Sequence, residues 1–207
     1  MRLIETPADL DEGAAHLAAV CPVWARILPQ LGPLPLRRRP DGFAAICDAV
    51  VSQQISTAAA AAIAGRMQAA GLVDQAAIAG AADDDLRAVG LSRPKIKYLR
   101  GIVQAGVDWT GLRDMSDDAV IDSLTALPGI GRWTADIYLK FALGRADAFA
   151  AGDLALAESA RLLYDLPDRP GPAGLTALAE PWRPWRSVAA RGLWAYYRQA
   201  KGGEGIR

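Results

Sequence analysis

A Pro-Gly-x-Gly turn at residues 128–131 constrains this chain more than any other feature of its sequence. Apolar residues at helical spacing precede it from Leu124, and the spacing continues after it through Phe141. Because glycine tolerates positive φ angles, a helix can end, reverse and restart within these few residues. The second helix would present free backbone N–H groups and its positive dipole end, which together bind anions. The turn predicts either a helix–hairpin–helix that holds a nucleic-acid phosphate or an ordinary corner between two helices.

The rest of the chain also has helical spacing, and no segment of useful length alternates apolar and polar residues as a strand does. The fold class is therefore predicted to be all-α. The sequence DDDLRAVG (83–90) is expected to be a turn, and the Pro/Gly-rich stretch 166–174 a loop. Helices are expected at about 7–20, 22–31, 57–70, 75–80, 93–106, 117–126 and 132–143, with a last helix ending near residue 200. The apolar run FAAICDAVV (43–51) is expected to be a further buried helix, which SQQIS (52–56) joins to the helix at 57–70.

The chain of 207 residues can bury a substantial core, as one domain or as two small lobes. No run approaches the about 18 apolar residues of a membrane span, and the N-terminus lacks the layout of a signal peptide. We therefore expect a cytoplasmic protein of bacterial type with no membrane partner.

Cysteine and histidine are too sparse for several kinds of active site. Cys21 and Cys47 have neither metal-site nor disulfide spacing and are expected to be small buried residues. His16 is the only histidine, so serine–histidine catalysis and metal hydrolysis by a histidine cluster are poorly supported.

The formal net charge is zero, which argues against a protein that coats nucleic acid by bulk attraction. Two basic clusters occur, at residues 37–39 and at residues 93–100, where Arg93, Lys95, Lys97 and Arg100 have no acid among them. Such clusters are usually solvated faces. Any binding of DNA must therefore be local.

Asp153 lies 22 positions after Gly131 and directly precedes the apolar helical segment LALAESARLLY. As the N-cap of that helix its carboxylate would accept backbone N–H bonds and stay ionised. An ionised carboxylate near a phosphate-binding turn is useful where a cation develops, as in cleavage of an N-glycosidic bond through an oxocarbenium-like sugar. The alternative is that Asp153 only caps the helix.

Three motifs in this order carry a resemblance to a known family: LPGIGRWTAD (127–136), an aspartate about twenty residues later, and WRPWRS (182–187). Together they resemble the helix-hairpin-helix (HhH-GPD) superfamily of DNA base-excision glycosylases, and most of all its DNA-3-methyladenine glycosylase II type. The resemblance covers roughly residues 42–198. It implies two helical lobes with a cleft between them, a wedge-side lobe at about 42–115 and a hairpin and aspartate lobe at about 116–180. Residues 1–41 and 181–207 would pack with the lobes.

The resemblance also implies roles for individual residues. Asp153 matches the catalytic aspartate, and Gln54 in SQQIS (52–56) matches the side chain that fills the gap left by a flipped nucleotide, although this segment also reads as helix capping. Phosphate contacts are implied for Gly129, Gly131, Thr134, Lys95 and Lys97. The backbone carbonyls of Thr125, Leu127 and Ile130 match those that hold a monovalent cation, Na⁺ or K⁺.

Trp133 stands where relatives that also cut the DNA strand have a Schiff-base lysine, so this route to lyase activity is not expected. Trp133 and Trp194 are candidates to sandwich an extruded base, with Trp194 as a core residue in the alternative. Ile137 is a further candidate for the base pocket, at a position where a larger bacterial enzyme of the same type has an aromatic residue. An N3- or N7-alkylated purine is cationic, gains about 0.5–2 kcal/mol per cation–π contact, and leaves without a general acid.

The function implied is a monofunctional glycosylase that excises alkylated purines of the 3-methyladenine and 7-methylguanine class from double-stranded DNA in base excision repair. It would leave an abasic site and act as a monomer at the nucleoid. The four-cysteine tail of an iron–sulfur cluster is missing, so no such cluster is expected. The alternatives are a non-catalytic DNA-binding module, which needs neither Asp153 nor Trp133, and a glycosylase for oxidised or deaminated bases.

Overall fold

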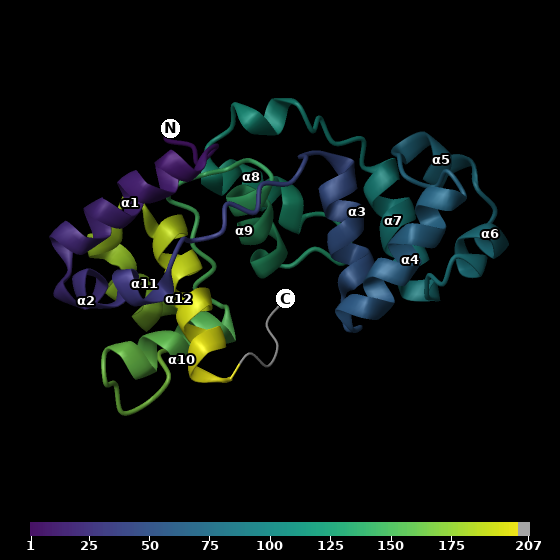
Figure 1. Ribbon diagram of the computed structural model, residues 1–207. Coiled ribbons are helices and arrows are strands. Elements are labelled where there is room, and N and C mark those ends of the chain that lie inside the picture. Colours follow the sequence, from purple (N-terminus) through teal and green to yellow (C-terminus); the bar gives the residue numbers. More distant parts are fainter. Residues whose placement is uncertain (203–207) are drawn as a thin grey trace. The chain divides into compact units, whose positions relative to one another are not determined.

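The computed structural model describes residues 1–202 and is helical throughout that range, which confirms the all-α prediction (Figure 1). Within this range strand-like pairing is confined to an isolated bridge between Leu3 and Arg145. The elements are α1 (Pro7–Val20), α2 (Pro22–Leu31), α3 (Phe43–Ser52), α4 (Thr57–Ala69), α5 (Gln75–Gly80), α6 (Asp83–Ala88), α7 (Arg93–Gln104), η1 (Gly111–Arg113), α8 (Asp117–Thr125), α9 (Arg132–Phe141), α10 (Leu154–Leu163), α11 (Pro172–Ala179), η2 (Glu180–Trp182) and α12 (Arg186–Ala200).

The predicted helices lie where the sequence placed them, to within two residues at their ends, and two further helices were missed. The expected turn at residues 83–90 is wrong: these residues form the short helix α6, because the Asp85 carboxylate accepts the Ala82 N–H at 3.1 Å and caps its first turn. The expected loop at residues 166–174 is wrong in its last three residues, because helix α11 begins at Pro172, where the missing N–H costs nothing.

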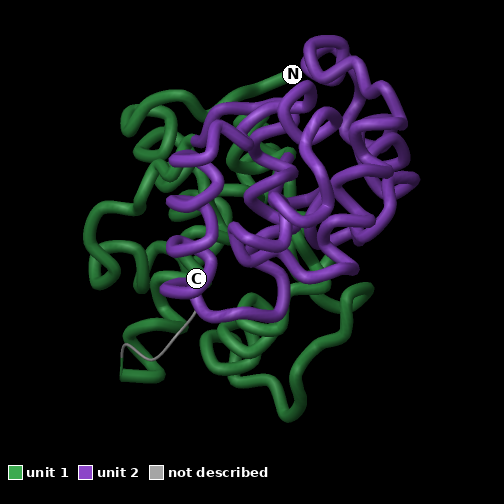
Figure 2. The backbone as a smooth tube through the Cα atoms, turned by 90° about the vertical axis from the view of Figure 1, so that its right-hand side faces the viewer, with its two compact units in different colours: residues 1–38, 139–207 green, residues 39–138 purple. Residues whose placement is uncertain are grey.

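The chain forms two compact units, one of residues Arg39–Tyr138 and one of Met1–Arg38 with Leu139–Arg207 (Figure 2). The boundary falls within α9. This division differs from the expected lobes, because the hairpin turn belongs to the unit that carries the wedge-side helices. The reason is close packing inside that unit. A Cβ built on Gly101 in α7 would lie 2.6 Å from Pro128 Cγ, so only glycine lets the turn approach this helix.

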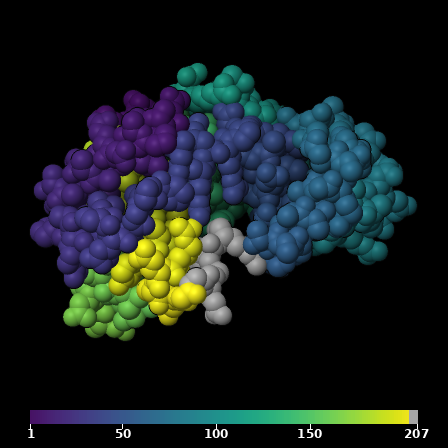
Figure 3. All heavy atoms as spheres, in the orientation of Figure 1, coloured from purple at the N-terminus to yellow at the C-terminus, as the bar shows by residue number. Residues whose placement is uncertain are grey.

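The unit Arg39–Tyr138 buries one apolar side of each helix from α3 to α8. Its surface over α4 to α7 is drawn in blue to teal in Figure 3. Fully buried members of this core are Ile46, Val50, Ile78, Leu86, Leu99, Ile102, Val120 and Leu124. Cys47 belongs to the same core, and burial raises the pKa of its thiol to about 12, as expected of an inert structural cysteine.

The second unit is built on α12, which packs against α10, α1 and α2 (Figures 1 and 3). Trp24 and Trp182 are both buried and meet edge to face, with ring centroids 5.4 Å apart. Trp182 is therefore a core residue.

Arg191 in α12 is buried in the same unit. Burial and the nearby charges of Arg37 and Arg38 lower the pKa of Arg191 to about 10. Its guanidinium group donates to the carbonyls of Pro35, Leu36 and Ser187.

Candidate functional site

The hairpin turn links α8 to α9 with few residues and little freedom. Leu127 and Ile130 point into the core, and the Ile130 N–H donates to the Leu127 carbonyl at 3.2 Å. Gly131 accepts the Ala135 N–H at 3.1 Å and so begins α9 as its N-cap. The N–H groups of the first turn of α9 have no acceptor inside the helix, and this end carries the positive end of the helix dipole. The turn therefore has the geometry of an anion site.

Gly129 and Gly131 differ in what surrounds them. Gly129 has φ +78°, and a Cβ there would lie 2.4 Å from Cδ2 of Tyr98, which packs on the turn from α7. Gly131 has no atom within 4 Å of the same construction. Gly129 is thus required by the fold of the turn, whereas the space at Gly131 is open to a ligand.

The segment between α3 and α4 supports the expected wedge residue. Gln54 is exposed and has φ +56°, a left-handed conformation that is uncommon for a residue with a side chain. Ser56 caps α4 through the Ala59 N–H at 3.1 Å, as the capping interpretation of SQQIS predicts. The capping interpretation is therefore confirmed at Ser56, whereas the wedge role of Gln54 stays a prediction.

Gln53 is a residue that the sequence interpretation missed. Its Nε2 donates to the carbonyl of Gly129 at 2.8 Å and so ties the segment that carries Gln54 to the hairpin turn. A glutamine next to a matched motif residue carries no spacing signal, so this bond could not have been found from the sequence.

Helix α9 carries Trp133 at 47% exposure, unusually open for tryptophan. Ile137 lies one helical turn further along the same face and is half-buried. Thr134, expected at the phosphate, is buried, which leaves little of its side chain for a ligand. Asp136 is buried and pairs with Arg132 at 3.1 Å, four residues earlier.

The two candidate lysines of α7 have different environments. Lys95 is 8% exposed, its Nζ donates to the Val51 carbonyl at 2.6 Å, and burial lowers its pKa. A phosphate contact does not fit that environment, because the ammonium group binds the last turn of α3. Lys97, two residues later, is exposed.

In the second unit Asp153 is the N-cap of α10, as predicted. Its Oδ1 accepts the N–H groups of Ala155 at 2.9 Å and Leu156 at 3.2 Å, and the residue is 7% exposed. The position of the carboxylate is thus fixed by the helix that follows.

Trp194 in α12 is 8% exposed, which does not fit the open stacking surface expected of it. Phe141 stacks on it at 5.8 Å between ring centroids, and Lys140 Nζ lies 4.3 Å from its ring centroid. Within residues 1–202 its indole N–H has no hydrogen-bond acceptor. The face of this ring is occupied by the protein and its N–H is buried, so Trp194 packs as a core residue, which is the alternative that the sequence left open.

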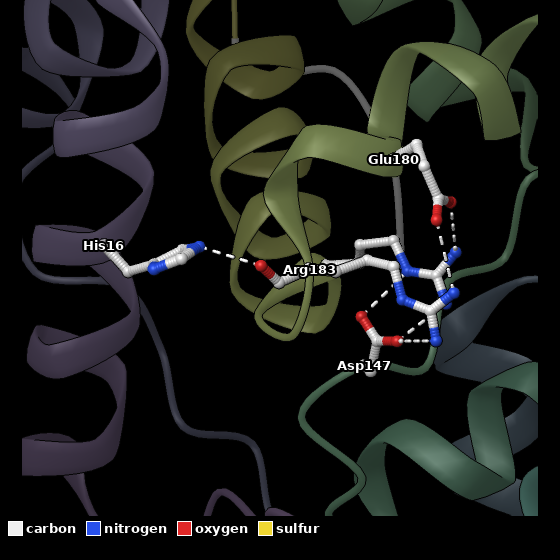
Figure 4. A network of polar contacts seen from close by, with 5 residues as sticks. His16, Asp147, Glu180 and Arg183 are labelled. Atoms are coloured by element: carbon white, nitrogen blue, oxygen red, sulfur yellow. Dashed lines mark hydrogen bonds and ion pairs between the residues drawn. The ribbon is translucent and has the colours of Figure 1, made fainter.

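Asp147 holds the segment between α9 and α10, which leads to Asp153, through the arginines of the WRPWRS motif (Figure 4). Its carboxylate accepts two bonds of 2.8 Å from Arg186 and pairs with Arg183 at 3.0 Å. The Ser187 N–H donates to the Ala146 carbonyl at 2.9 Å on the same segment. The motif is therefore an anchor for the segment that carries Asp153.

His16 is also part of this anchor and not of a catalytic group. Its Nε2 lies 2.8 Å from the Arg183 carbonyl, and since a carbonyl only accepts, that nitrogen carries the proton (Figure 4).

The candidate residues are distributed over both units. The unit Arg39–Tyr138 holds the turn, Trp133, Ile137, Gln54 and both lysines, whereas Asp153 and Trp194 belong to the other unit.

Metal ligands of the side-chain kind are missing from the described range: residues 1–202 contain no cluster of three or more His, Cys, Asp or Glu placed to hold an ion. The carbonyls of Thr125, Leu127 and Ile130 all come from the hairpin segment, and the one on Leu127 keeps a second lone pair. The monovalent cation stays a prediction.

Residues 1–202 include no helix that is both long and apolar enough to cross a membrane.

The family model of HhH-GPD superfamily base excision DNA repair proteins matches residues 47–184, which include the turn, Asp153 and the first part of WRPWRS. The chain belongs to this superfamily. DNA-3-methyladenine glycosylase 1 of Schizosaccharomyces pombe is 30% identical over 204 residues, 92% of this chain and 89% of that protein. The family predicted from the sequence is confirmed.

Solved structures agree over nearly the whole chain. A DNA-3-methyladenine glycosidase from Bacillus halodurans superposes with a TM-score of 0.84 at 30% identity and covers 98% of this chain and 95% of its own. A Schizosaccharomyces pombe 3-methyladenine DNA glycosylase in complex with abasic DNA superposes with a TM-score of 0.74 at 27% identity. It covers 95% of this chain and 100% of its own. The glycosylase fold is thereby confirmed.

The anchor at Asp147 yields a prediction about stability. Asp147→Ala, Arg186→Ala and the double variant should give a coupling free energy of about 1–3 kcal/mol in urea unfolding, because the pair is bidentate and largely buried. The matched control is the exposed pair Arg87–Asp84, 3.3 Å long, for which the same cycle should give less than about 1 kcal/mol. Equal couplings for the two pairs would contradict the anchor.

Proposed function

We propose that this protein is a monofunctional DNA glycosylase that excises alkylated purines from double-stranded DNA and leaves an abasic site. The observation that carries the proposal is Asp153, a buried carboxylate held by two backbone N–H groups in a chain that also has the family's phosphate-binding turn. A pure binding module would need such a group only as the cap of α10. The relatives named as 3-methyladenine glycosylases support the same substrate class.

The unit Arg39–Tyr138 holds the DNA. The N-terminal turn of α9 receives a backbone phosphate at Gly131, where the surface is open and the helix dipole favours an anion. Gln54 enters the gap left by the flipped nucleotide. The hydrogen bond from its neighbour Gln53 to the Gly129 carbonyl sets the position of Gln54 relative to the turn. These contacts position the strand and do not read the base.

Trp133 supplies a stacking surface for the extruded base, since nearly half of it is open to a ligand. A purine alkylated at N3 or N7 carries a positive charge, and a tryptophan face attracts it by about 0.5–2 kcal/mol. Such a base leaves as a neutral molecule. No general acid is then needed, which agrees with a chain whose only histidine, His16, binds a backbone carbonyl.

Asp153 acts on the sugar. As the bond from C1′ to the base nitrogen breaks, positive charge develops on C1′ and the ring oxygen, and the ionised carboxylate stabilises it. Water then adds to C1′ and releases a proton. The backbone bonds of α10 hold the carboxylate before the reaction, so little reorganisation is needed in the transition state.

Two further properties belong to this proposal. The substrate is duplex DNA with an alkylated base, bound by a monomer, and the site of action is the cytoplasm, at the nucleoid. The oligomeric state can be read from the mass of the free protein and of its DNA complex in solution.

The carboxylate can be tested alone with Asp153→Asn, because asparagine keeps the oxygen that accepts the two N–H bonds and caps a helix equally well. We expect release of 7-methylguanine from methylated DNA to fall about 100-fold or more, with thermal stability and affinity for an abasic-site duplex near the wild-type values. Release at the wild-type rate would refute the role of Asp153. Wild-type protein that binds but releases no base would favour a non-catalytic module.

The hairpin can be tested by a matched pair of glycine substitutions. Gly131→Ala should cost less than about 1 kcal/mol of stability yet weaken DNA binding, since its methyl group occupies the open space at the phosphate. Gly129→Ala should cost about 2 kcal/mol or more, because its φ is +78° and Tyr98 blocks the methyl group. Unfolding in urea and anisotropy of a labelled duplex measure the two effects. Unchanged affinity of Gly131→Ala at fixed salt would contradict the phosphate contact.

Monofunctional chemistry predicts that borohydride traps no covalent complex between the protein and damaged DNA, since Trp133 stands where a lyase would need its lysine. Gel electrophoresis after reduction detects such a complex. A trapped adduct would mean that one of the lysines forms a Schiff base, and peptide mapping would identify it.

A further inference from the structure

A hollow of about 560 Å³ lies on the unit Arg39–Tyr138, beside the hairpin turn. Its walls come from α6, α7 and the turn itself. Four cations, one acid and a turn residue define its character: Arg87, Arg93, Lys97, Arg100, Asp83 and Pro128.

The cations differ in how much of their charge is already used. Arg100 donates to the carbonyls of Ile78, Ala79 and Ala81 at the end of α5 and pairs with Asp83 at 3.3 Å, so it is structural. Arg87 pairs with Asp84 at 3.3 Å.

Arg93 and Lys97 are exposed, and neither side chain has a hydrogen bond or ion pair with another residue of the described range 1–202. Spaced four residues apart, they project from one face of α7. The hollow therefore offers two uncommitted positive charges held on one helix.

The same hollow is continuous with the proposed phosphate site. Pro128 lines it and is also the first residue of the Pro-Gly-x-Gly turn. Gly101 lies at the contact between α7 and Pro128, so the helix that carries Arg93 and Lys97 is packed directly on the turn. A DNA strand held at the turn has further phosphates on either side, and this hollow is where one of its flanks would meet positive charge.

We propose that Arg93 joins Lys97, for which the family resemblance already implies a phosphate contact, and that from this hollow the two bind backbone phosphates of the DNA strand that flanks the hairpin contact. The protein then has a second, sequence-independent contact surface next to its phosphate clamp. The inference rests on the proposed function in that it takes DNA as the ligand of the turn. Ile96 and Gly101 give the hollow an apolar floor on which a deoxyribose can lie.

A phosphodiester strand fits this hollow better than a small nucleotide does. No aromatic side chain lines it, so a base has nothing to stack on. Asp83 at the rim repels a compact, multiply charged anion more than it repels one phosphodiester. Because the whole chain has zero formal net charge, two unpaired cations beside the turn are a substantial local attraction.

The test compares two double variants by anisotropy, with a labelled duplex that carries a tetrahydrofuran abasic-site analogue. Arg93→Ala with Lys97→Ala should weaken binding about tenfold per lost phosphate contact at 0.1 M salt and lower the slope of log K against log salt by about 1–2. The control is Arg26→Ala with Lys201→Ala, which removes the same two charge types from exposed positions of the other unit. We expect the control to bind as the wild type does.

Methylphosphonate substitution locates the contact. Duplexes with one neutral linkage at successive positions should each lose affinity for the wild type where a phosphate is bound, and the Arg93/Lys97 variant should lose this sensitivity at flanking positions only. Unchanged affinity, equal weakening by the control pair, or unaltered sensitivity along the strand would each overturn the inference.

Two further arms separate the inference from its alternatives. If inorganic phosphate binds the wild type but not the Arg93/Lys97 variant while both bind DNA equally, the hollow is a site for a free anion and the inference is wrong. If wild-type protein releases no base from methylated DNA yet its DNA affinity depends on Arg93 and Lys97, the proposed catalysis fails and the contact surface stands.

Discussion

The close approach of the hairpin turn to α7 is the constraint on which the rest of this arrangement depends. Gly129 takes a left-handed conformation directly against the Tyr98 ring, and Gly101 lets Pro128 reach the helix axis. The turn is thus part of the core of its unit. Since the turn cannot move without unpacking α7, the N-terminus of α9 presents its N–H groups in one fixed direction. The bond from Gln53 to Gly129 extends that rigidity to Gln54. The proposed phosphate binding and wedge insertion would consequently both depend on one packing contact.

Asp153 is positioned by a separate set of polar contacts. Its carboxylate has two tasks, since it caps α10 and carries the charge for the proposed chemistry, and the cap is what fixes the charge in place. The segment that leads to it is tied through Asp147 to Arg186, the first residue of α12, and to Arg183, which directly follows η2. WRPWRS therefore contributes to the site without supplying a reacting group. A motif that marks a family can in this way identify the support of an active site rather than its chemistry.

The sequence predicted the helices, the hairpin, Asp153 as an N-cap and the family, because each depends on local spacing that the residues themselves display. Lys95 and Trp194 could not be predicted, because their roles depend on which neighbours packing brings to them. Lys95 lies two residues from Lys97 on the same helix, yet one side chain enters the core and the other faces water. The ring of Trp194 is covered by Phe141 and Lys140, the last two residues of α9. The compact units divide the chain differently from the expected lobes for the same reason, since the contact of Pro128 with Gly101 has no signature in the sequence.

Counting cations overestimates the surface that this chain can offer to DNA. Several of its basic side chains donate hydrogen bonds to backbone carbonyl groups at or near helix ends, which have no acceptor role left inside the helix. The carbonyls that accept these bonds follow α9 for Arg38, follow α6 for Arg66, lie at the end of α3 for Lys95 and lie at the end of α5 for Arg100. Such a cation cannot also bind a phosphate without exposing a carbonyl, which costs about 1–3 kcal/mol. In a chain of zero formal net charge, the few cations that are not used in this way decide where a polyanion can dock. Arg93 and Lys97, placed beside the turn, are two of them.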